Sequence, residues 1–256
     1  IGERNFFPDF AHDIERFATT DGPEPYPALE VWVPETLKEA DEAFDWLAEA
    51  EVGSCDLETT GLSAISDTIL AAGFCVLEED GTSGTTVIID ERLMEKKKPW
   101  RRIAAMVSDP DQELVFHNAK FDLQFLKTGL EARGFAYAPE NVHDTMMLHY
   151  AIDERPMGRF NSHSLKNLAR IYFDAPDYSL NFEKKSPFFY PLKQVLEYHA
   201  LDIYYTGELY HVFKRQLHDD RDLHKLFYNL TMPVSTMLTD AEFKGVWVDR
   251  LRANRT

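Results

Sequence analysis

The sequence has few cysteines and no long apolar run. Two cysteines, Cys55 and Cys75, occur among 256 residues, which excludes a disulfide framework and favours reduced core residues in adjacent strands. No apolar stretch approaches the roughly 20 residues of a membrane span, and the N-terminus lacks the basic-then-apolar pattern of a secretory signal. These absences favour a globular protein of a cytosol-like compartment with no membrane partner.

Basic charge is also scarce. Asp and Glu number 44 against 27 Lys and Arg, for a formal net charge of −17. This balance argues against a protein that holds duplex DNA by electrostatics alone. It does not exclude a nucleic-acid enzyme, because bound divalent cations reverse the local field.

The apolar pattern predicts an α/β fold with a mixed sheet. A first strand at 29–33 and an amphipathic helix at 34–51 precede three strands that we expect to form an antiparallel meander. A helix, a further strand and another helix that ends at Gly129 follow, and the pattern is helical almost throughout from about residue 144. The three meander strands are 52–58, 68–79 and 84–90, and the later helix and strand are 91–107 and 113–118.

Two acids stand inside the first meander strand, in the stretch Ser54 to Leu62. Residues i and i+2 of a strand point to the same face, so Asp56 and Glu58 project together. Two ionised carboxylates that are buried side by side repel each other unless a cation lies between them. Taken alone, the pair is more simply explained as a solvated strand end.

A second acidic signal follows the strand at 113–118. Asn118 and Asp122 are four residues apart on the first turns of a helix, at a strand terminus where sites occur in α/β sheets. In the alternative, purely structural interpretation, Asn118 is the helix N-cap and Asp122 is a favourable first-turn acid.

The third signal is the hardest to explain structurally. Tyr198 and Asp202 share one face of a long helix, and Asp202 lies on an otherwise apolar stripe with no Lys or Arg within a helical turn. A buried carboxylate at this position needs a partner, and an Arg distant in sequence is the structural alternative to a metal ion. The four acids together offer only oxygen ligands, without Cys or His at ligand spacing, which indicates Mg²⁺ or Mn²⁺ in a two-metal site rather than zinc.

These residues resemble the motifs of the DEDD superfamily of 3′→5′ exonucleases, which implies a ribonuclease H-like fold. The motif D-x-E corresponds to Asp56-Leu57-Glu58, N-x-x-x-F/Y-D to Asn118–Asp122 and Y-x-x-x-D to Tyr198–Asp202. Because Glu197 stands where the sister group has a His, the chain resembles the tyrosine subtype, and we assign no role to His199.

The C-terminal stretch sharpens the resemblance. Residues 245–249, Gly-Val-Trp-Val-Asp, resemble the strand by which family A DNA polymerases enter their polymerase region, and 143–153 and 162–169 resemble the same branch. The implied organisation is an N-terminal arm (1–28), a proofreading exonuclease domain (29–215) and a helical junction with the start of a truncated polymerase region (216–256). We therefore expect a monomer, in a bacterial or phage-infected cell, with that polymerase region as its partner in the parent chain.

The resemblance also implies roles for the acids. Asp56 bridges two Mg²⁺ or Mn²⁺ ions, Glu58 and Asp202 hold the first, and Asp122 holds the second through water. Tyr198 orients the nucleophile, and attack on the terminal phosphodiester of single-stranded or frayed DNA releases nucleoside 5′-monophosphates.

Further residues are expected to contact the terminal nucleotides. Leu62 takes the position of a wedge between the last two bases, although a core leucine explains it equally well. Contacts to the DNA end are also expected from Thr59, His117, Asn118 and Phe121. Asp144 either supports the site or caps a helix.

Two rival functions share these motifs. A ribonuclease D-like exoribonuclease uses the same carboxylates, and the Gly-Val-Trp-Val-Asp tail disfavours it. A catalytically silent, DNA-binding scaffold domain of a polymerase is the other, and the intact set of four acids with Tyr198 disfavours that reading.

Overall fold

The computed structural model describes residues 27–78, 83–154, 163–178 and 190–249. The predicted N-terminal arm therefore lies, except for residues 27 and 28, outside the described residues. None of the helices within these residues combines the length and the hydropathy of a membrane span.

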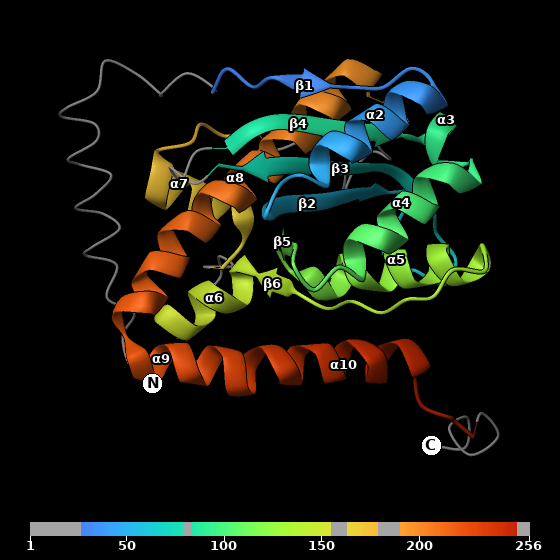
Figure 1. Ribbon diagram of the computed structural model, residues 1–256. Helices are drawn as coiled ribbons and strands as arrows, with labels where there is room; N and C mark the ends of the chain where they lie inside the picture. The colour runs from blue at the N-terminus through green and yellow to red at the C-terminus, as the bar shows by residue number, and fades with distance from the viewer. Residues whose placement is uncertain (1–26, 79–82, 155–162, 179–189, 250–256) are drawn as a thin grey trace.

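A six-stranded mixed sheet forms the centre of the molecule, in the order β1-β4-β3-β2-β5-β6 (Figure 1). Strands β2, β3 and β4 pair antiparallel, whereas β1, β5 and β6 join by parallel pairing. The predicted meander and the mixed α/β class are confirmed. The strands are β1 (Val31–Trp32), β2 (Val52–Thr59), β3 (Ile69–Leu77), β4 (Ser83–Asp90), β5 (Glu113–Phe116) and β6 (Val142–Asp144).

Helices cover both faces of this sheet. One core joins the sheet to α2 (Leu37–Leu47), α4 (Lys97–Val107) and α5 (Ala119–Ala132). A second core lies against α6 (Thr145–Ile152), α7 (Leu165–Phe173) and the long α8 (Leu192–Asp219). Burial on both faces explains why β3 reads as one continuous apolar run instead of alternating.

Helices continue beyond α8. The chain forms α9 (Arg221–Leu226), a π-helical turn η2 (Phe227–Thr231) and α10 (Met232–Lys244), which lies along the lower edge of the molecule in Figure 1. Helix α10 packs on α5, the helix that follows the β5 strand end.

Several predicted boundaries are wrong. The helix expected at 91–107 is two helices, α3 (Glu91–Met94) and α4, because Lys96 adopts an extended backbone with φ −88° and ψ 147°. Helix α5 does not stop at Gly129 but runs to Ala132, since packing against Trp100 overrides the weak helix propensity of glycine.

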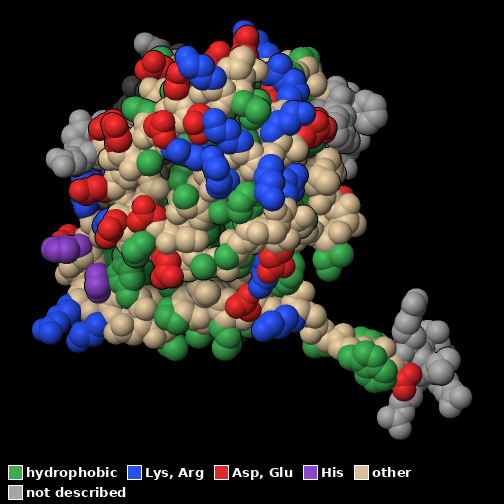
Figure 2. Space-filling model, turned by 45° about the vertical axis from the view of Figure 1, so that its right-hand side comes forward, with side chains coloured by type: hydrophobic (Ala, Val, Ile, Leu, Met, Phe, Trp, Pro, Cys, Tyr) green, Lys and Arg blue, Asp and Glu red, His purple; other side chains and the backbone are tan. Residues whose placement is uncertain are grey.

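Two strand assignments also differ. The short strand β6 was not predicted, because three residues are too few for a periodic pattern. The strand expected at 245–249 is absent: these residues have no regular secondary structure, and Trp247 is 88% exposed. This C-terminal segment projects from the body of the molecule (Figure 2). Among the described residues no strand lies beside this segment to pair with it.

Candidate metal centre

The D-x-E pair lies on the α8 side of β2. Cys55 and Leu57 belong to the core under α2, α4 and α5, so the alternation of the strand turns Asp56 and Glu58 toward α8. The prediction that both carboxylates share a face is confirmed. Ligand oxygens of Asp56, Glu58 and Asp202 all lie within 4.8 Å of one another.

Asp122 comes from the first turn of α5 and approaches β2 from the other direction. Pairing between β2 and β5 extends only to Ser54, and further along β2 the Leu57 N–H donates to Asp122 Oδ1 at 3.1 Å. This bond satisfies a backbone group next to the acids. Asp122 is 2% exposed, and it lies outside the cluster of three. The structure therefore gathers three of the four predicted acids and places the fourth beside them.

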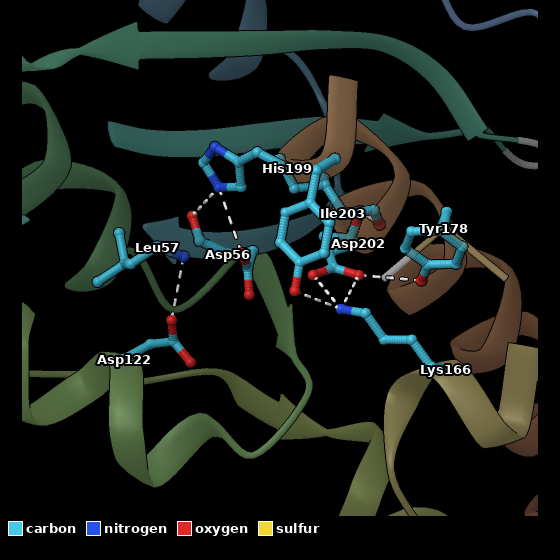
Figure 3. Close-up of polar contacts among 10 residues, drawn as sticks. Asp56, Leu57, Asp122, Lys166, Tyr178, His199, Asp202 and Ile203 are labelled. Carbon is cyan, nitrogen blue, oxygen red and sulfur yellow. Dashed lines mark hydrogen bonds and ion pairs between the residues drawn. The ribbon is translucent and has the colours of Figure 1, made fainter. Parts of the chain in front are cut away.

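Asp202 has partners that the sequence did not indicate (Figure 3). Lys166 Nζ, from α7, donates to both carboxylate oxygens of Asp202 at 2.5 Å and to Tyr198 Oη at 2.7 Å. The hydroxyl of Tyr178 donates to Asp202 Oδ1 at 2.9 Å. Asp202 thus has a distant cationic partner, as in the alternative to a metal site, but the cation is a lysine and not an arginine.

His199, to which we assigned no role, contacts Asp56 in the structure. Its Nε2 lies 3.0 Å from the backbone oxygen and 3.3 Å from Oδ2 of Asp56, and the residue is fully buried (Figure 3). His199 therefore contacts both the backbone and the carboxylate of Asp56. The motif on this helix consists of Tyr198 and Asp202, so its spacing carried no information about His199, which lies three residues before Asp202 and faces the same acid, Asp56.

Burial shifts the protonation of the cluster. Burial first, and the neighbouring carboxylates next, raise the pKa of Glu58 to about 8. The same causes raise the pKa of Asp122 well above its usual range, and burial raises that of Asp56 against the opposing hydrogen bond from His199. Burial and Asp202 raise the pKa of Tyr198, so this phenol is protonated at neutral pH.

The donor set fits a hard divalent cation. Three carboxylates with oxygens this close repel one another when ionised, and a cation between them removes that repulsion. Carboxylate oxygens are the ligands that Mg²⁺ and Mn²⁺ prefer. Asp56, Glu58 and Asp202 could therefore hold a metal ion.

Asp144 serves both of the alternatives considered for it. Its carboxylate caps α6 by accepting from the N–H groups of Met146 and Met147, at 2.9 and 3.3 Å. It also accepts from the N–H groups of Asn118 and Ala119, at 3.0 and 2.9 Å. One buried acid thus anchors the start of α5, from which Asp122 projects.

Three of the residues expected to contact nucleic acid lie on the segments that carry the acids, since Thr59 ends β2 and Asn118 and Phe121 begin α5. Leu62 is 89% exposed, so the alternative of a core leucine is wrong. Thr59 Oγ1 donates to the Gly61 carbonyl at 2.7 Å, and His117 Nδ1 lies 2.8 Å from Thr145 Oγ1. Asn118 occupies the N-cap position of α5, as in the structural alternative, but its backbone is left-handed with φ 65° and its side chain makes no capping hydrogen bond. The Phe121 ring lies 5.0 Å from that of Phe125.

Sequence comparison identifies relatives among DNA polymerases. The chain is 32% identical over 165 residues to the DNA polymerase of Escherichia phage T5. This alignment covers 57% of the present chain and 19% of the phage polymerase. It is 30% identical over 157 residues to DNA polymerase I of Chloroflexus aurantiacus, covering 58% and 15% respectively. The chain thus spans less than a quarter of the length of either relative.

Structural comparison finds the same fold in a protein solved with bound Mg²⁺. Brucella melitensis NrnC with bound Mg²⁺ superposes with a TM-score of 0.57 at 20% identity, covering 86% of this chain and 96% of NrnC. The 3′-5′ exonuclease family matches residues 31–218, which contain all three acidic motifs. The chain therefore belongs to the 3′-5′ exonuclease family found in DNA polymerase I.

Proposed function

We propose that this chain is a proofreading 3′→5′ exodeoxyribonuclease that hydrolyses the terminal phosphodiester of single-stranded or frayed DNA. The products are nucleoside 5′-monophosphates, and the reaction depends on two Mg²⁺ or Mn²⁺ ions. The observation that carries the proposal is the cluster of Asp56, Glu58 and Asp202, whose ligand oxygens lie within 4.8 Å of one another.

The acids divide between two ion positions in this proposal. Asp56, Glu58 and Asp202 would hold one ion, and Asp122 with Asp56 would hold the second. Bound ions would stabilise charge on the phosphate and lower the pKa of water. The Mg²⁺ in NrnC, which has the same fold, supports this choice of metal.

Tyr198 acts as a hydrogen-bonding group and not as the base. Burial and the neighbouring Asp202 keep its phenol protonated at neutral pH. Its hydroxyl oxygen, at the edge of the acidic cluster, can orient the attacking water. His199 keeps the Asp56 carboxylate in place through its Nε2.

The DNA end is proposed to lie between Leu62 and the start of α5. A mismatched terminus is easier to unpair, which favours frayed ends. Thr59, His117, Asn118 and Phe121 are proposed to contact the last nucleotide.

The wedge can be tested at Leu62. Because the side chain is 89% exposed, Leu62→Ala should leave the melting temperature unchanged. It should slow digestion of a paired end relative to a single-stranded end by several-fold, measured on matched oligonucleotides. An equal effect on both substrates would remove the wedge from the proposal.

DNA is proposed as the substrate because the sequence relatives are DNA polymerases. On the same ground, we propose that the chain works beside a polymerase region of its parent chain, as a monomer in the cytoplasm of a bacterial or phage-infected cell. The proposed domain boundaries, 29–215 for the exonuclease and 216–256 for the junction, lie close to the matched range 31–218.

The decisive experiment is digestion of 5′-labelled oligonucleotides in Mg²⁺ or Mn²⁺. The chain should shorten DNA from the 3′ end, and Asp56→Asn should lower the rate by at least about a hundredfold. Glu197→Gln is the matched control, since Glu197 is an exposed acid beside Tyr198 outside the cluster. Faster digestion of RNA than of DNA would overturn the DNA assignment, and no digestion of either would overturn the enzymatic proposal.

A further inference from the structure

Lys166 reaches the acidic cluster from α7. It is in the first turn of α7, and its side chain is 30% exposed whereas that of Asp202 is 7% exposed. The ammonium contacts both oxygens of Asp202 symmetrically at 2.5 Å. The rings of Tyr198 and Tyr178 flank it, with centroids 4.3 and 5.2 Å from Nζ.

The Asp202 oxygens that Lys166 contacts are the atoms this residue offers to a metal. Oδ1 already accepts from Lys166 and from Tyr178, which together use its two lone pairs. Oδ2 accepts from Lys166. A divalent ion shared with Asp56 and Glu58 would therefore lie close to the ammonium, and like charges at that distance in a buried site repel strongly.

We propose that Lys166 is a resident cation of the site, which neutralises Asp202 and positions Tyr198 until a divalent metal ion takes the same carboxylate. Metal binding and the Lys166–Asp202 ion pair then exclude each other, and the flexible lysine side chain withdraws when the metal enters. This inference rests on the proposed metal-dependent function, because it concerns the same three acids.

Two consequences follow for the chain itself. Without metal, Lys166 supplies positive charge to a carboxylate that would otherwise be buried and unpaired, so the metal-free protein stays folded. With metal, the ion must first break that pair, so Lys166 lowers the apparent metal affinity.

The test is Mn²⁺ binding by calorimetry, together with melting temperatures in EDTA and in Mn²⁺. Lys166→Met, which keeps the side-chain length without the charge, should bind Mn²⁺ about tenfold more tightly than the wild type. In EDTA this variant should melt at a lower temperature than the wild type. Its melting temperature should also rise more than that of the wild type when Mn²⁺ is added. Lys166→Arg should retain the wild-type affinity within about threefold, because the charge remains.

A second lysine provides the matched control. Lys214 Nζ lies 2.7 Å from Glu113 Oε2, which also accepts from Tyr210, so the same lysine, tyrosine and carboxylate chemistry occurs outside the acidic cluster. Lys214→Met changes the net charge equally and should leave Mn²⁺ affinity unchanged. If Lys166→Met does not fold, Lys166→Gln carries the same expectation.

The outcomes separate this inference from the proposed function. Unchanged or weaker Mn²⁺ binding by Lys166→Met, with normal binding by the wild type, would overturn the inference alone. Equal tightening by Lys166→Met and Lys214→Met would also overturn it, as an effect of net charge. A wild-type chain that binds no Mn²⁺ would overturn both the inference and the metal-dependent function.

Discussion

At the scale of single residues, the chemistry of the site comes from carboxylates that are held out of water. Glu58 is 8% exposed and Asp202 is 5% exposed, yet each faces further acids. Such an arrangement costs stability whenever the acids are ionised without a cation. The stability of the protein is therefore linked to pH through these carboxylates.

The pH dependence of stability tests this link at Glu58. Its pKa is about 8 in the folded protein, against an ordinary value of 4.5, so the folded state keeps a proton that the unfolded state releases. In EDTA, the free energy of unfolding should fall as the pH rises from about 4.5 to 8, by at most about 1.4 kcal/mol per pH unit for this group. Urea titrations across that range measure the slope.

Glu58→Gln should make this slope shallower, and saturating Mn²⁺ should do the same in the wild type, because the bound ion favours the ionised carboxylate. The slope should not vanish in the variant, since burial also raises the pKa of Asp56 and Asp122. An identical slope in wild type and Glu58→Gln would contradict the assignment of the raised pKa to Glu58.

At the scale of elements, the close approach of α8 to β3 positions two of the three motifs against each other. Gly73 of β3 allows this approach, because a Cβ there would lie 2.1 Å from Ile203 Cδ1 and 3.0 Å from His199 Cε1. Ser54 Oγ donates to the Ile203 carbonyl at 2.9 Å and joins β2 to the same stretch of α8. The register of α8 on the sheet thus brings Asp202 to Asp56.

Gly73→Ala should displace α8 and destabilise the protein by about 1–3 kcal/mol through overpacking. The exonuclease rate should fall with it, because Asp202 and His199 move relative to Asp56. Urea unfolding and the oligonucleotide assay measure the two effects. Gly53→Ala is the control, since a Cβ there meets the nearest atom, the Cys75 carbonyl oxygen, at an ordinary 3.6 Å; equal losses in both variants would rule out this packing explanation.

At the scale of the whole molecule, α10 is attached to the helix that carries Asp122. Lys127 Nζ lies 2.9 Å from Asp240, and Lys120 Nζ lies 2.8 Å from Glu242. Lys127 also lies over the ring of Phe243, 4.8 Å from its centroid. Charged contacts between partly exposed side chains therefore help to hold α10 against α5.

Partly exposed ion pairs contribute about 0–1 kcal/mol each and weaken with salt. The double variant Asp240→Asn and Glu242→Gln should therefore accelerate amide hydrogen exchange in α10, as should a high salt concentration in the wild type. Exchange in α8 serves as the internal control and should not change. Equal acceleration in α8 would show that these pairs support the whole fold and not only α10.

The sequence by itself determined the antiparallel meander of β2, β3 and β4 and the spacing of the acidic motifs. Alternation placed Asp56 and Glu58 on one face of β2, and helical spacing placed Tyr198 and Asp202 on one face of α8. These are local regularities, because the strand repeat of two and the helix repeat of 3.6 residues are properties of the backbone alone.

Only the tertiary structure decided which groups meet the acids. Lys166, 36 residues before Asp202, and His199, which contacts Asp56 across 143 residues, became partners through the packing of α7 and α8 on the sheet. Tertiary context also determined where elements end, since Gly129 continues α5 against Trp100, whereas 245–249 form no strand. The physical reason is that charge pairing, close packing and strand pairing require a second segment, and the periodicity of one segment does not specify its neighbour.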